Sequence, residues 1–261
     1  STFAGPAFQE GFVNGPATQA RLRRPVGVAV DAQGNVFIAD TGNHAVRRIA
    51  SDAARTVTTI AGTGTPGVGE GAGATTALRS PQSIAIAADG TLYVADTGNH
   101  RVVRIARDER WTVSTFAGSK DGRQGKVDGV GTAARFQTPS SVTFAGTDLY
   151  VADTFNHRLA RIAPDGRVST LIGARGSGST NGPASQAKLH RPTGVAFGGG
   201  ALWVVDTGNR LIRRVAMDAA FTTSTAAGAV TGGFSDGAGS AALFLPMLGA
   251  VHVQDRLLVT D

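Results

Sequence analysis

The chain has no cysteine and few aromatic or charged residues. Its 261 residues include 6% aromatic and 17% charged side chains. Without cysteine, a small fold held together by disulfides is excluded. No apolar run approaches the roughly 18 residues that a membrane-spanning helix needs, so none is predicted. Because 41% of the residues are hydrophobic, we expect a folded, soluble globule rather than a disordered or fibrous chain.

A signal-peptide pattern is also missing. Residues 1–11 have neither a basic start nor an apolar stretch, and the chain begins with Ser instead of Met. We therefore expect that the native N-terminus has been removed. The sequence indicates no cellular compartment.

Glycine, by contrast, is abundant, with 36 residues, about twice the usual share. Three markers recur with a common period of 53 to 58 residues. An Asp-Thr-Gly-Asn-His block or a variant of it begins at Asp40, Asp96, Asp153 and Asp206, and its first residue returns at Asp261. A proline before an apolar stretch stands at Pro25, Pro81, Pro139, Pro192 and Pro246. A Thr-x-x-Gly sequence ends at Gly5, Gly62, Gly118, Gly173 and Gly228.

Each repeat contains four short β-branched and aromatic runs bounded by Gly, Asp and Asn, which is typical of strands joined in hairpins. The first strands are predicted at 28–30, 84–86, 142–144 and 195–197. The second strands are predicted at 36–39, 92–95, 149–152 and 202–205. The third are predicted at 46–49, 102–105, 159–162 and 212–215, and the fourth at 57–61, 113–117, 168–172 and 223–227. Four antiparallel strands at this period predict an all-β fold, a β-propeller.

The Asn-His motif after an Ile-Ala-Asp or Val-Ala-Asp strand resembles the NHL repeat, and the resemblance covers essentially the whole chain. It implies a propeller, usually of six blades, and a family with RNA-binding, protein-binding, sensor and a few lyase members. We expect a single propeller over 1–261, with repeats at about 25–62, 81–118, 139–173, 192–228 and a partial one at 246–261. Five blades are represented, the last one incomplete. Residues 1–5 are predicted as a lone outer strand, and the native ring is expected to have six blades.

The polar residues that recur once per blade are interpreted as structural. This set comprises Asp40, Asn43, His44, Asp96, Asn99, His100, Asp153, Asn156, His157, Asp206 and Asn209. An aspartate at the start of a turn accepts backbone N–H bonds two residues on. Histidines spread over successive blades do not converge on a metal ion. We therefore expect no metal, no cofactor and no catalytic residue among them.

The resemblance offers a further test for zinc. Lyases similar to this repeat are implied to bind zinc through histidines just after the proline that opens the first strand. The matching residues here are Val26, Gln82, Ser140, Thr193 and Met247. None is a histidine, so this resemblance predicts no zinc site.

Basic residues form two groups in a chain of net charge +6. Nine lie in the third strand or at its entry: Arg47, Arg48, Arg101, Arg104, Arg158, Arg161, Arg210, Arg213 and Arg214. We expect their stems to cover the blade surface and their charged heads to lie in water. Seven lie in the linkers between blades: Arg21, Arg23, Arg24, Arg79, Arg135, Lys188 and Arg191. These linkers are 18 to 21 residues long, and their Ala-rich segments are expected to form one or two helical turns.

Strand alternation places the linkers and the Asn-His turns on one face of the propeller. The residues predicted to contact a partner there are Arg23, Arg24, Val26, Arg79, Gln82, Ser140, Arg191, Thr193 and Met247. We interpret the chain as a non-catalytic binding or scaffold module whose partner is a protein. One alternative is binding of RNA, an anionic glycan or another polyanion through the basic linkers. A second is a lyase or hydrolase with an atypical site.

Overall fold

The computed structural model of the chain describes residues 3–6, 9–245, 247, 249–253 and 256–260. The predicted markers Pro246 and Asp261 lie outside these residues. The chain divides into two compact units, residues 1–124 and 125–261, and each is described by itself. Among the described residues, no helix is long and apolar enough to cross a membrane.

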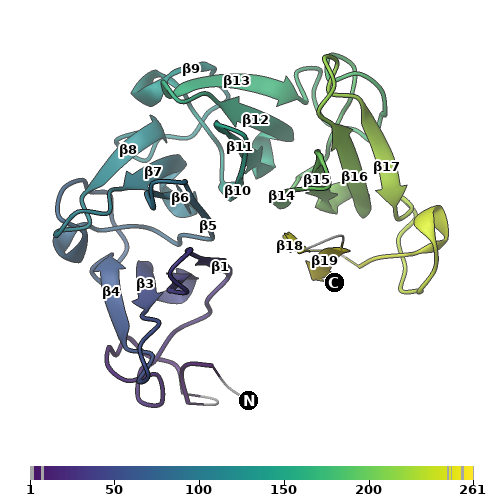
Figure 1. Ribbon diagram of the computed structural model, residues 1–261. Coiled ribbons are helices and arrows are strands. Elements are labelled where there is room, and N and C mark those ends of the chain that lie inside the picture. The colour runs from purple at the N-terminus through teal and green to yellow at the C-terminus, as the bar shows by residue number, and fades with distance from the viewer. Residues whose placement is uncertain (1–2, 7–8, 246, 248, 254–255, 261) are drawn as a thin grey trace. The chain divides into compact units, whose positions relative to one another are not determined.

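Unit 1 contains two four-stranded antiparallel sheets whose strands pair in chain order (Figure 1). The first sheet consists of β1 (Gly27–Val30), β2 (Val36–Asp40), β3 (Ala45–Ile49) and β4 (Val57–Ala61). The second consists of β5 (Ser83–Ile86), β6 (Leu92–Asp96), β7 (Arg101–Ile105) and β8 (Val113–Gly118).

Unit 2 repeats the same order. Its first sheet holds β10 (Pro139–Ala145), β11 (Asp148–Asp153), β12 (Arg158–Ile162) and β13 (Arg167–Ile172), with the short β9 (Gly129–Val130) added at the edge beside β13. Its second sheet holds β14 (Gly194–Gly198), β15 (Ala201–Asp206), β16 (Leu211–Ala216) and β17 (Thr223–Ala227). Two further strands, β18 (Gly249–Val253) and β19 (Arg256–Thr260), form a hairpin.

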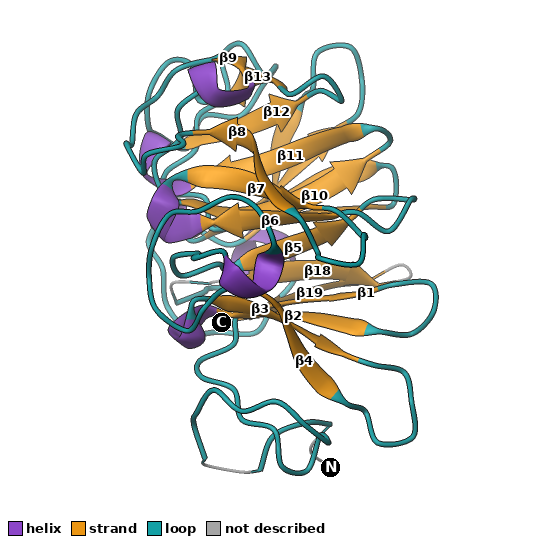
Figure 2. Ribbon diagram, turned by 90° about the vertical axis from the view of Figure 1, so that its left-hand side faces the viewer, coloured by secondary structure: helices purple, strands orange, loops and turns teal. Residues whose placement is uncertain are grey.

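Short 3₁₀ turns lie at the ends of the strands, outside the sheets (Figure 2). Four of them follow the second strand of a repeat: η1 (Thr41–Asn43), η3 (Thr97–Asn99), η5 (Thr154–Asn156) and η6 (Thr207–Asn209). Three lie in linkers: η2 (Gly73–Thr75), η4 (Gly131–Ala133) and η7 (Gly239–Ala241). The linker turns are single and begin before the Ala-rich segments in which we predicted them. Both η2 and η4 begin at a glycine that the local backbone requires, because a Cβ at position 73 would overlap the carbonyl oxygen of Ile60 and Gly131 has a φ of 54°.

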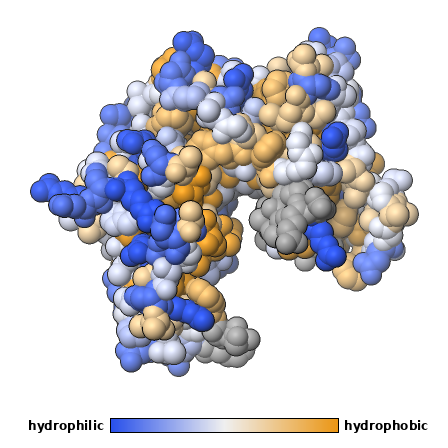
Figure 3. Space-filling model, viewed as in Figure 1, coloured by the Kyte–Doolittle hydropathy of each residue, from blue (hydrophilic) through white to orange (hydrophobic). Residues whose placement is uncertain are grey.

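The core of each unit lies between its sheets. In unit 1, Phe37 and Val46 of the first sheet pack against Ile84, Val94 and Val103 of the second, and all five are buried. In unit 2, Tyr150 and Leu159 belong to a matching cluster with Val195, Val204 and Val215. The second strand of each repeat is thus apolar on both faces because it lies between two layers. In unit 1, apolar residues gather over the strands labelled β1 and β5 in the same view of Figure 1, and hydrophilic residues over the loops at the left-hand edge (Figure 3).

The sheet face of β1 differs from its counterparts. Val28 is 66% exposed, whereas Ile84, Val142 and Val195 at the same position of later repeats are 6%, 4% and 3% exposed. The reason is that, among the described residues of unit 1, no sheet lies against this face of β1, because the second sheet packs on its opposite face.

The predicted lone strand over residues 1–5 is not found at residues 3–5, which form a bend. Gly5 adopts a φ of 84°, and its N–H donates to the carbonyl of Ala17 over 2.8 Å. This contact fixes the segment to the linker that follows it rather than to a sheet. Residues 1–2 lie outside the described residues.

Candidate functional site

The turn after the second strand has the same backbone in all four complete repeats. In the first repeat, η1 ends at His44, which adopts the left-handed conformation with a φ of 54°. Such a conformation is uncommon outside glycine. It recurs at His100, His157 and Arg210. The turn geometry therefore does not depend on histidine, since the fourth repeat has arginine at this position.

The aspartate of this turn accepts hydrogen bonds from three parts of the chain. One oxygen of Asp40, Oδ1, accepts the backbone N–H of Arg23 over 2.7 Å. The other, Oδ2, accepts Nδ2 of Asn43 and Nη1 of Arg47, each over 2.8 Å. Nδ2 of Asn43 also donates to the carbonyl of Gly11 over 2.7 Å. The carboxylate thus joins the turn, the third strand and the linker.

The same contacts recur in the other repeats. The linker N–H bound by the aspartate belongs to Arg79 for Asp96, to Gln137 for Asp153 and to His190 for Asp206. The predicted bond from the aspartate to an N–H two residues on is therefore wrong. The linker passes over the turn and supplies this N–H from 16 or 17 residues away.

The third-strand arginines also correct a prediction. We expected their charged heads to lie in water, but four of them have no exposed surface: Arg47, Arg101, Arg158 and Arg213. Each pairs with the buried aspartate of its own repeat over 2.6 to 2.8 Å. The arginines on the opposite face of the third strand agree better with the expectation. Arg104 and Arg214 are exposed, and Arg48 and Arg161 are half-buried. Alternation along the strand separates the two groups.

Burial of these charges is costly unless every charge is paired. Desolvation raises the pKa of Asp96, Asp153 and Asp206, while the arginine and the hydrogen bonds to each carboxylate act in the opposite direction. Desolvation likewise lowers the pKa of Arg47. Each pair is therefore a fixed structural element whose loss on one side would leave an unpaired buried charge.

Two different positions supply the arginine. In the first and fourth repeats it lies seven residues after the aspartate and donates through Nη1, as Arg47 does. In the second and third repeats it lies five residues after the aspartate and donates through Nε, as Arg101 does. Positions two apart on a strand face the same side, so both reach the same carboxylate. The Nε atoms of Arg47 and Arg213 have no hydrogen-bond partner.

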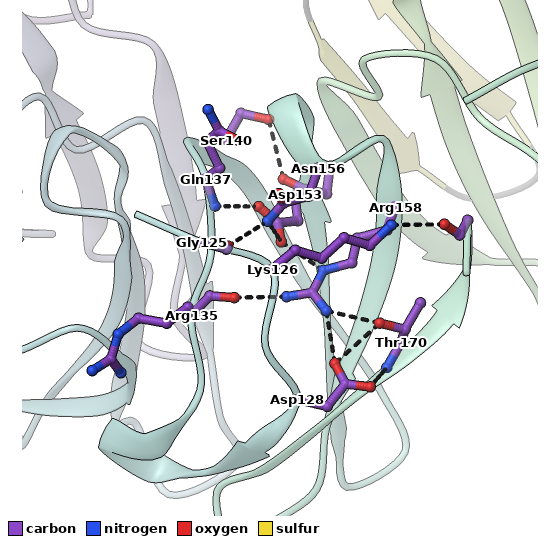
Figure 4. Close-up of polar contacts among 12 residues, drawn as sticks. Gly125, Lys126, Asp128, Arg135, Gln137, Ser140, Asp153, Asn156, Arg158 and Thr170 are labelled. Atoms are coloured by element: carbon purple, nitrogen blue, oxygen red, sulfur yellow. Dashed lines mark hydrogen bonds and ion pairs between the residues drawn. The ribbon is translucent and has the colours of Figure 1, made fainter. Parts of the chain in front are cut away.

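The third repeat shows how the arginine fastens the linker (Figure 4). Arg158 donates to Asp153 through Nε over 2.6 Å, to Asp128 through Nη1 over 2.7 Å and to the carbonyl of Arg135 through Nη2 over 2.8 Å. Asp128 in turn accepts the N–H of Thr170 in β13 over 2.8 Å. The linker is thus bonded both to the turn and to the outermost strand.

The turn histidines connect one repeat to the next. Nδ1 of His44 accepts the N–H of Ser80, and Nδ1 of His157 accepts the N–H of Arg191, both over 3.0 Å. Desolvation is the largest cause that lowers the pKa of both histidines. The next largest is the charge of Arg23 for His44 and the charge of His190 for His157. A neutral imidazole is required for this acceptance, because a protonated ring has no lone pair to offer.

The predicted partner contacts divide into two groups. Arg23, Arg24, Val26, Arg79 and Arg191 are exposed. Arg23 makes an ion pair of 3.5 Å with Glu10, and both side chains are more than half exposed. Val26 is 62% exposed.

The other predicted contacts face the protein more than the solvent. Ser140 donates to the carbonyl of Thr193 over 2.8 Å, and Thr193 donates to the carbonyl of Met247 over 3.2 Å. Gln82 is half-buried. Met247 is fully buried beside Val205 and Ile212, so its predicted exposure at a binding surface is wrong. Strand β18 lies against β14 and β15, and Leu257 and Val259 of β19 belong to the same cluster as Met247.

No group of three or more His, Asp or Glu side chains that could hold a metal ion occurs among the described residues. Sequence reasoning did not find the linker contacts or the buried arginines. The signal was present: one arginine follows each turn aspartate by five or seven residues.

A model of the NHL repeat matches residues 22–49 and 78–105. NHL repeat-containing protein 2 of Homo sapiens is 35% identical in an alignment of 236 positions, gaps included, that covers 77% of this chain and 32% of that protein. Protein SUPPRESSOR OF QUENCHING 1, chloroplastic, of Arabidopsis thaliana is 28% identical in an alignment of 282 positions, gaps included, that covers 98% of this chain and 26% of that protein. The chain thus spans about a third of these relatives or less.

Among solved structures, a chain of the nidogen/laminin complex superposes with a TM-score of 0.62 at 16% identity, over 94% of this chain and 74% of that chain. Likeness at this identity shows the fold alone. Together with the repeated four-stranded sheets and the family match, it confirms the predicted class, an all-β propeller of four-stranded antiparallel blades. The expected number of six blades stays a prediction.

Proposed function

This chain belongs to the NHL repeat family, and we propose that it is a non-catalytic module that binds a protein partner. The proposed contact region, called the linker–turn surface, is defined in each unit by itself. In unit 1 it comprises the linkers 9–24 and 63–80 with the turns 40–44 and 96–100, and in unit 2 the linkers 125–138 and 174–191 with the turns 153–157 and 206–210.

The observation that carries the proposal is how the linkers are held. In each repeat the buried aspartate binds a linker N–H, and the asparagine of the turn binds a linker carbonyl. The linkers are long loops, yet their backbone is fixed by these bonds. Loops fixed on a rigid scaffold are common binding elements, because little entropy is lost when they meet a partner.

The exposed side chains on this surface supply the second argument. Arg24 and Arg191 both precede a proline and both have a positive φ, of 47° and 51°. Both arginines are held in this backbone conformation, which is uncommon outside glycine, and both are exposed. Arginine is a common interface residue because its planar group binds carboxylates in pairs of hydrogen bonds.

The test is charge reversal at Arg23, Arg24 and Arg191 together. The tagged protein and the triple glutamate variant are used to capture partners from extract of the source organism, with quantitative mass spectrometry as the readout. We expect at least tenfold less captured partner with the variant, and thermal unfolding within about 2 °C of the parent. The matched control reverses the exposed Arg104, Arg167 and Arg214, which gives the same change in net charge.

Equal capture by the triple variant and the control would contradict the proposed surface. Turnover of any member of a panel of esters, lactones and peptides would contradict the non-catalytic part. Binding of RNA would favour the polyanion alternative. In that case affinity falls steeply with salt, in proportion to the phosphates neutralised.

A further inference from the structure

The repeats deviate from their common pattern at one place in unit 2. The third residue of the turn is glycine at 42, 98 and 208 but phenylalanine at Phe155. In the linker that follows, His190 occupies the position that is Arg23, Arg79 and Gln137 in the three earlier linkers, and Arg191 the position that is Arg24, Ser80 and Thr138. Arginine also stands at this position in the first linker, but the combination of Phe155, His190 and Arg191 occurs at one boundary only. Structural roles recur in every repeat, so this combination points to a role other than folding.

The deviating residues contact one another. The guanidinium carbon of Arg191 lies 4.8 Å from the centre of the Phe155 ring. The rings of His157 and His190 have centres 5.1 Å apart. The N–H of Arg191 donates to Nδ1 of His157 over 3.0 Å. Lys126 belongs to the same group, because its charge and those of His190 and Arg191 lower the pKa of His157 in addition to burial.

These five residues, Lys126, Phe155, His157, His190 and Arg191, are called the Phe155 cluster. Lys126, Phe155 and Arg191 are exposed, and the two histidines are half-buried. In the described part of the chain neither Lys126 nor Arg191 forms an ion pair, and the ammonium of Lys126 donates only to the carbonyl of Gly173 over 2.9 Å.

Nearby carboxylates are already engaged. Asp153 and Asp128 both pair with Arg158, and Asp206 pairs with Arg213. Among the described residues, no acidic side chain forms an ion pair with Lys126 or Arg191, although the charges of Asp153 and Asp128 reach Lys126 and oppose the lowering of its pKa by burial and by Arg158. Stacking on Phe155 holds the Arg191 guanidinium in place, which reduces the entropy lost when an anion binds.

We propose that the Phe155 cluster binds a carboxylate of an acidic peptide segment, with Arg191 and Lys126 as the charged contacts. This inference rests on the proposed function and names the partner's chemistry at one point of the linker–turn surface. A carboxylate can accept two parallel hydrogen bonds from the planar guanidinium group of Arg191, and the ammonium group of Lys126 supplies a second positive charge.

A peptide fits better than a nucleic acid. Binding of single-stranded nucleic acid uses aromatic faces on which bases stack. One face of Phe155 is already covered by Arg191, and the two histidine rings of the cluster are half-buried and lie against one another. A carboxylate needs no stacking surface.

The experiment measures fluorescence anisotropy with three labelled probes: a hexaglutamate peptide, a hexaglutamine peptide and a ten-nucleotide uridine RNA. The proteins are the parent, the variant Lys126→Ser/Arg191→Ser and the control Arg104→Gln/Arg214→Gln. Serine occurs at the matching positions of other repeats, Ser179 and Ser80, so the first variant is expected to fold. Thermal unfolding checks this for every variant.

We expect the parent and the control to bind hexaglutamate alike, and the Lys126→Ser/Arg191→Ser variant to bind it at least tenfold more weakly. Hexaglutamine should bind the parent at least tenfold more weakly than hexaglutamate. Phe155→Gly, which restores the residue of the other repeats, should weaken binding by about two- to fivefold, as expected for loss of an exposed cation–π contact.

Equal hexaglutamate binding by the parent and the Lys126→Ser/Arg191→Ser variant would overturn the proposal, as would tighter binding of the RNA. If the peptide fails to bind while charge reversal at Arg23, Arg24 and Arg191 still abolishes partner capture, this inference falls and the proposed function stands. The reverse pair of results would remove the proposed function instead.

Discussion

The Nη1 atom of Arg47 lies 2.8 Å from Oδ2 of Asp40, and neither side chain has any exposed surface. The same pair is present in all four complete repeats. Because the aspartate also binds the linker, the pair determines where the linker–turn surface lies. Its contribution can be measured in any one repeat.

Removing one member of the pair should strongly destabilise the protein. We expect Arg101→Met to lower the free energy of unfolding by about 3–5 kcal/mol, because Asp96 would remain buried and unpaired. The double variant Asp96→Asn/Arg101→Met should cost less than the two single variants added together. Urea unfolding followed by circular dichroism measures all three. A cost below about 1 kcal/mol for Arg101→Met would show that the pair does not stabilise the fold.

The two positions of the arginine should be interchangeable. The variant Arg47→Val should be destabilised like Arg101→Met, and adding Ala45→Arg should recover at least half of the loss. The reason is that position 45 matches Arg101, five residues after the aspartate. Ala45→Arg alone is the control, and it should destabilise because two arginines would then share one carboxylate. No recovery in Ala45→Arg/Arg47→Val would mean that the two registers are specific to their repeats.

Stability should fall as the solution is acidified from about pH 7.5 to 5.5. His44, His100 and His157 have pKa values lowered by burial, so the unfolded chain takes up protons that the folded chain does not. Stability is therefore fully present above the ordinary histidine pKa of about 6.5 and decreases below it. Thermal melts across this range measure the effect.

The variant His44→Asn/His100→Asn/His157→Asn should show a flatter melting profile between pH 7.5 and 5.5. Asparagine tolerates the left-handed backbone and offers an oxygen as acceptor. An unchanged pH dependence in this variant would show that other groups cause it.

Glycine should be required after the fourth strand but not in the loop that follows. Gly173 has a φ of 95°, and a Cβ there would lie 2.3 Å from the carbonyl oxygen of His157. Gly176 has a φ of 84° and open space around the same position. Gly176→Ala should cost about 1–2 kcal/mol for the backbone alone, and Gly173→Ala clearly more. Equal costs, measured by urea unfolding, would contradict the close approach.

The strands were predictable to within a few residues at each end. The third strand of the first repeat is expected at 46–49 and found at Ala45–Ile49. Local signals are sufficient here, because β-branched runs between Gly, Asp and Asn determine where a hairpin strand starts and stops. The recurrence of each run in four repeats adds independent support.

The buried pairs were not predictable by the same reasoning. An arginine on a strand is expected to reach water, and Arg104 does. Arg101 lies three residues earlier, on the opposite face, where the linker closes over it and its Nη2 meets the carbonyl of Gly69. That contact spans 32 residues and belongs to a loop without periodic pattern. Likewise, the burial of Met247 depends on packing against another repeat.

The histidine bonds between successive repeats have a consequence for the order of assembly. Each joins residues 34 or 36 positions apart, and the serine and threonine bonds between neighbouring repeats of unit 2 span 53 or 54. Every such connection is complete once the next repeat has been synthesised. A chain leaving the ribosome can therefore add one sheet at a time to a preceding sheet that is already folded, with each new linker closing over a finished turn.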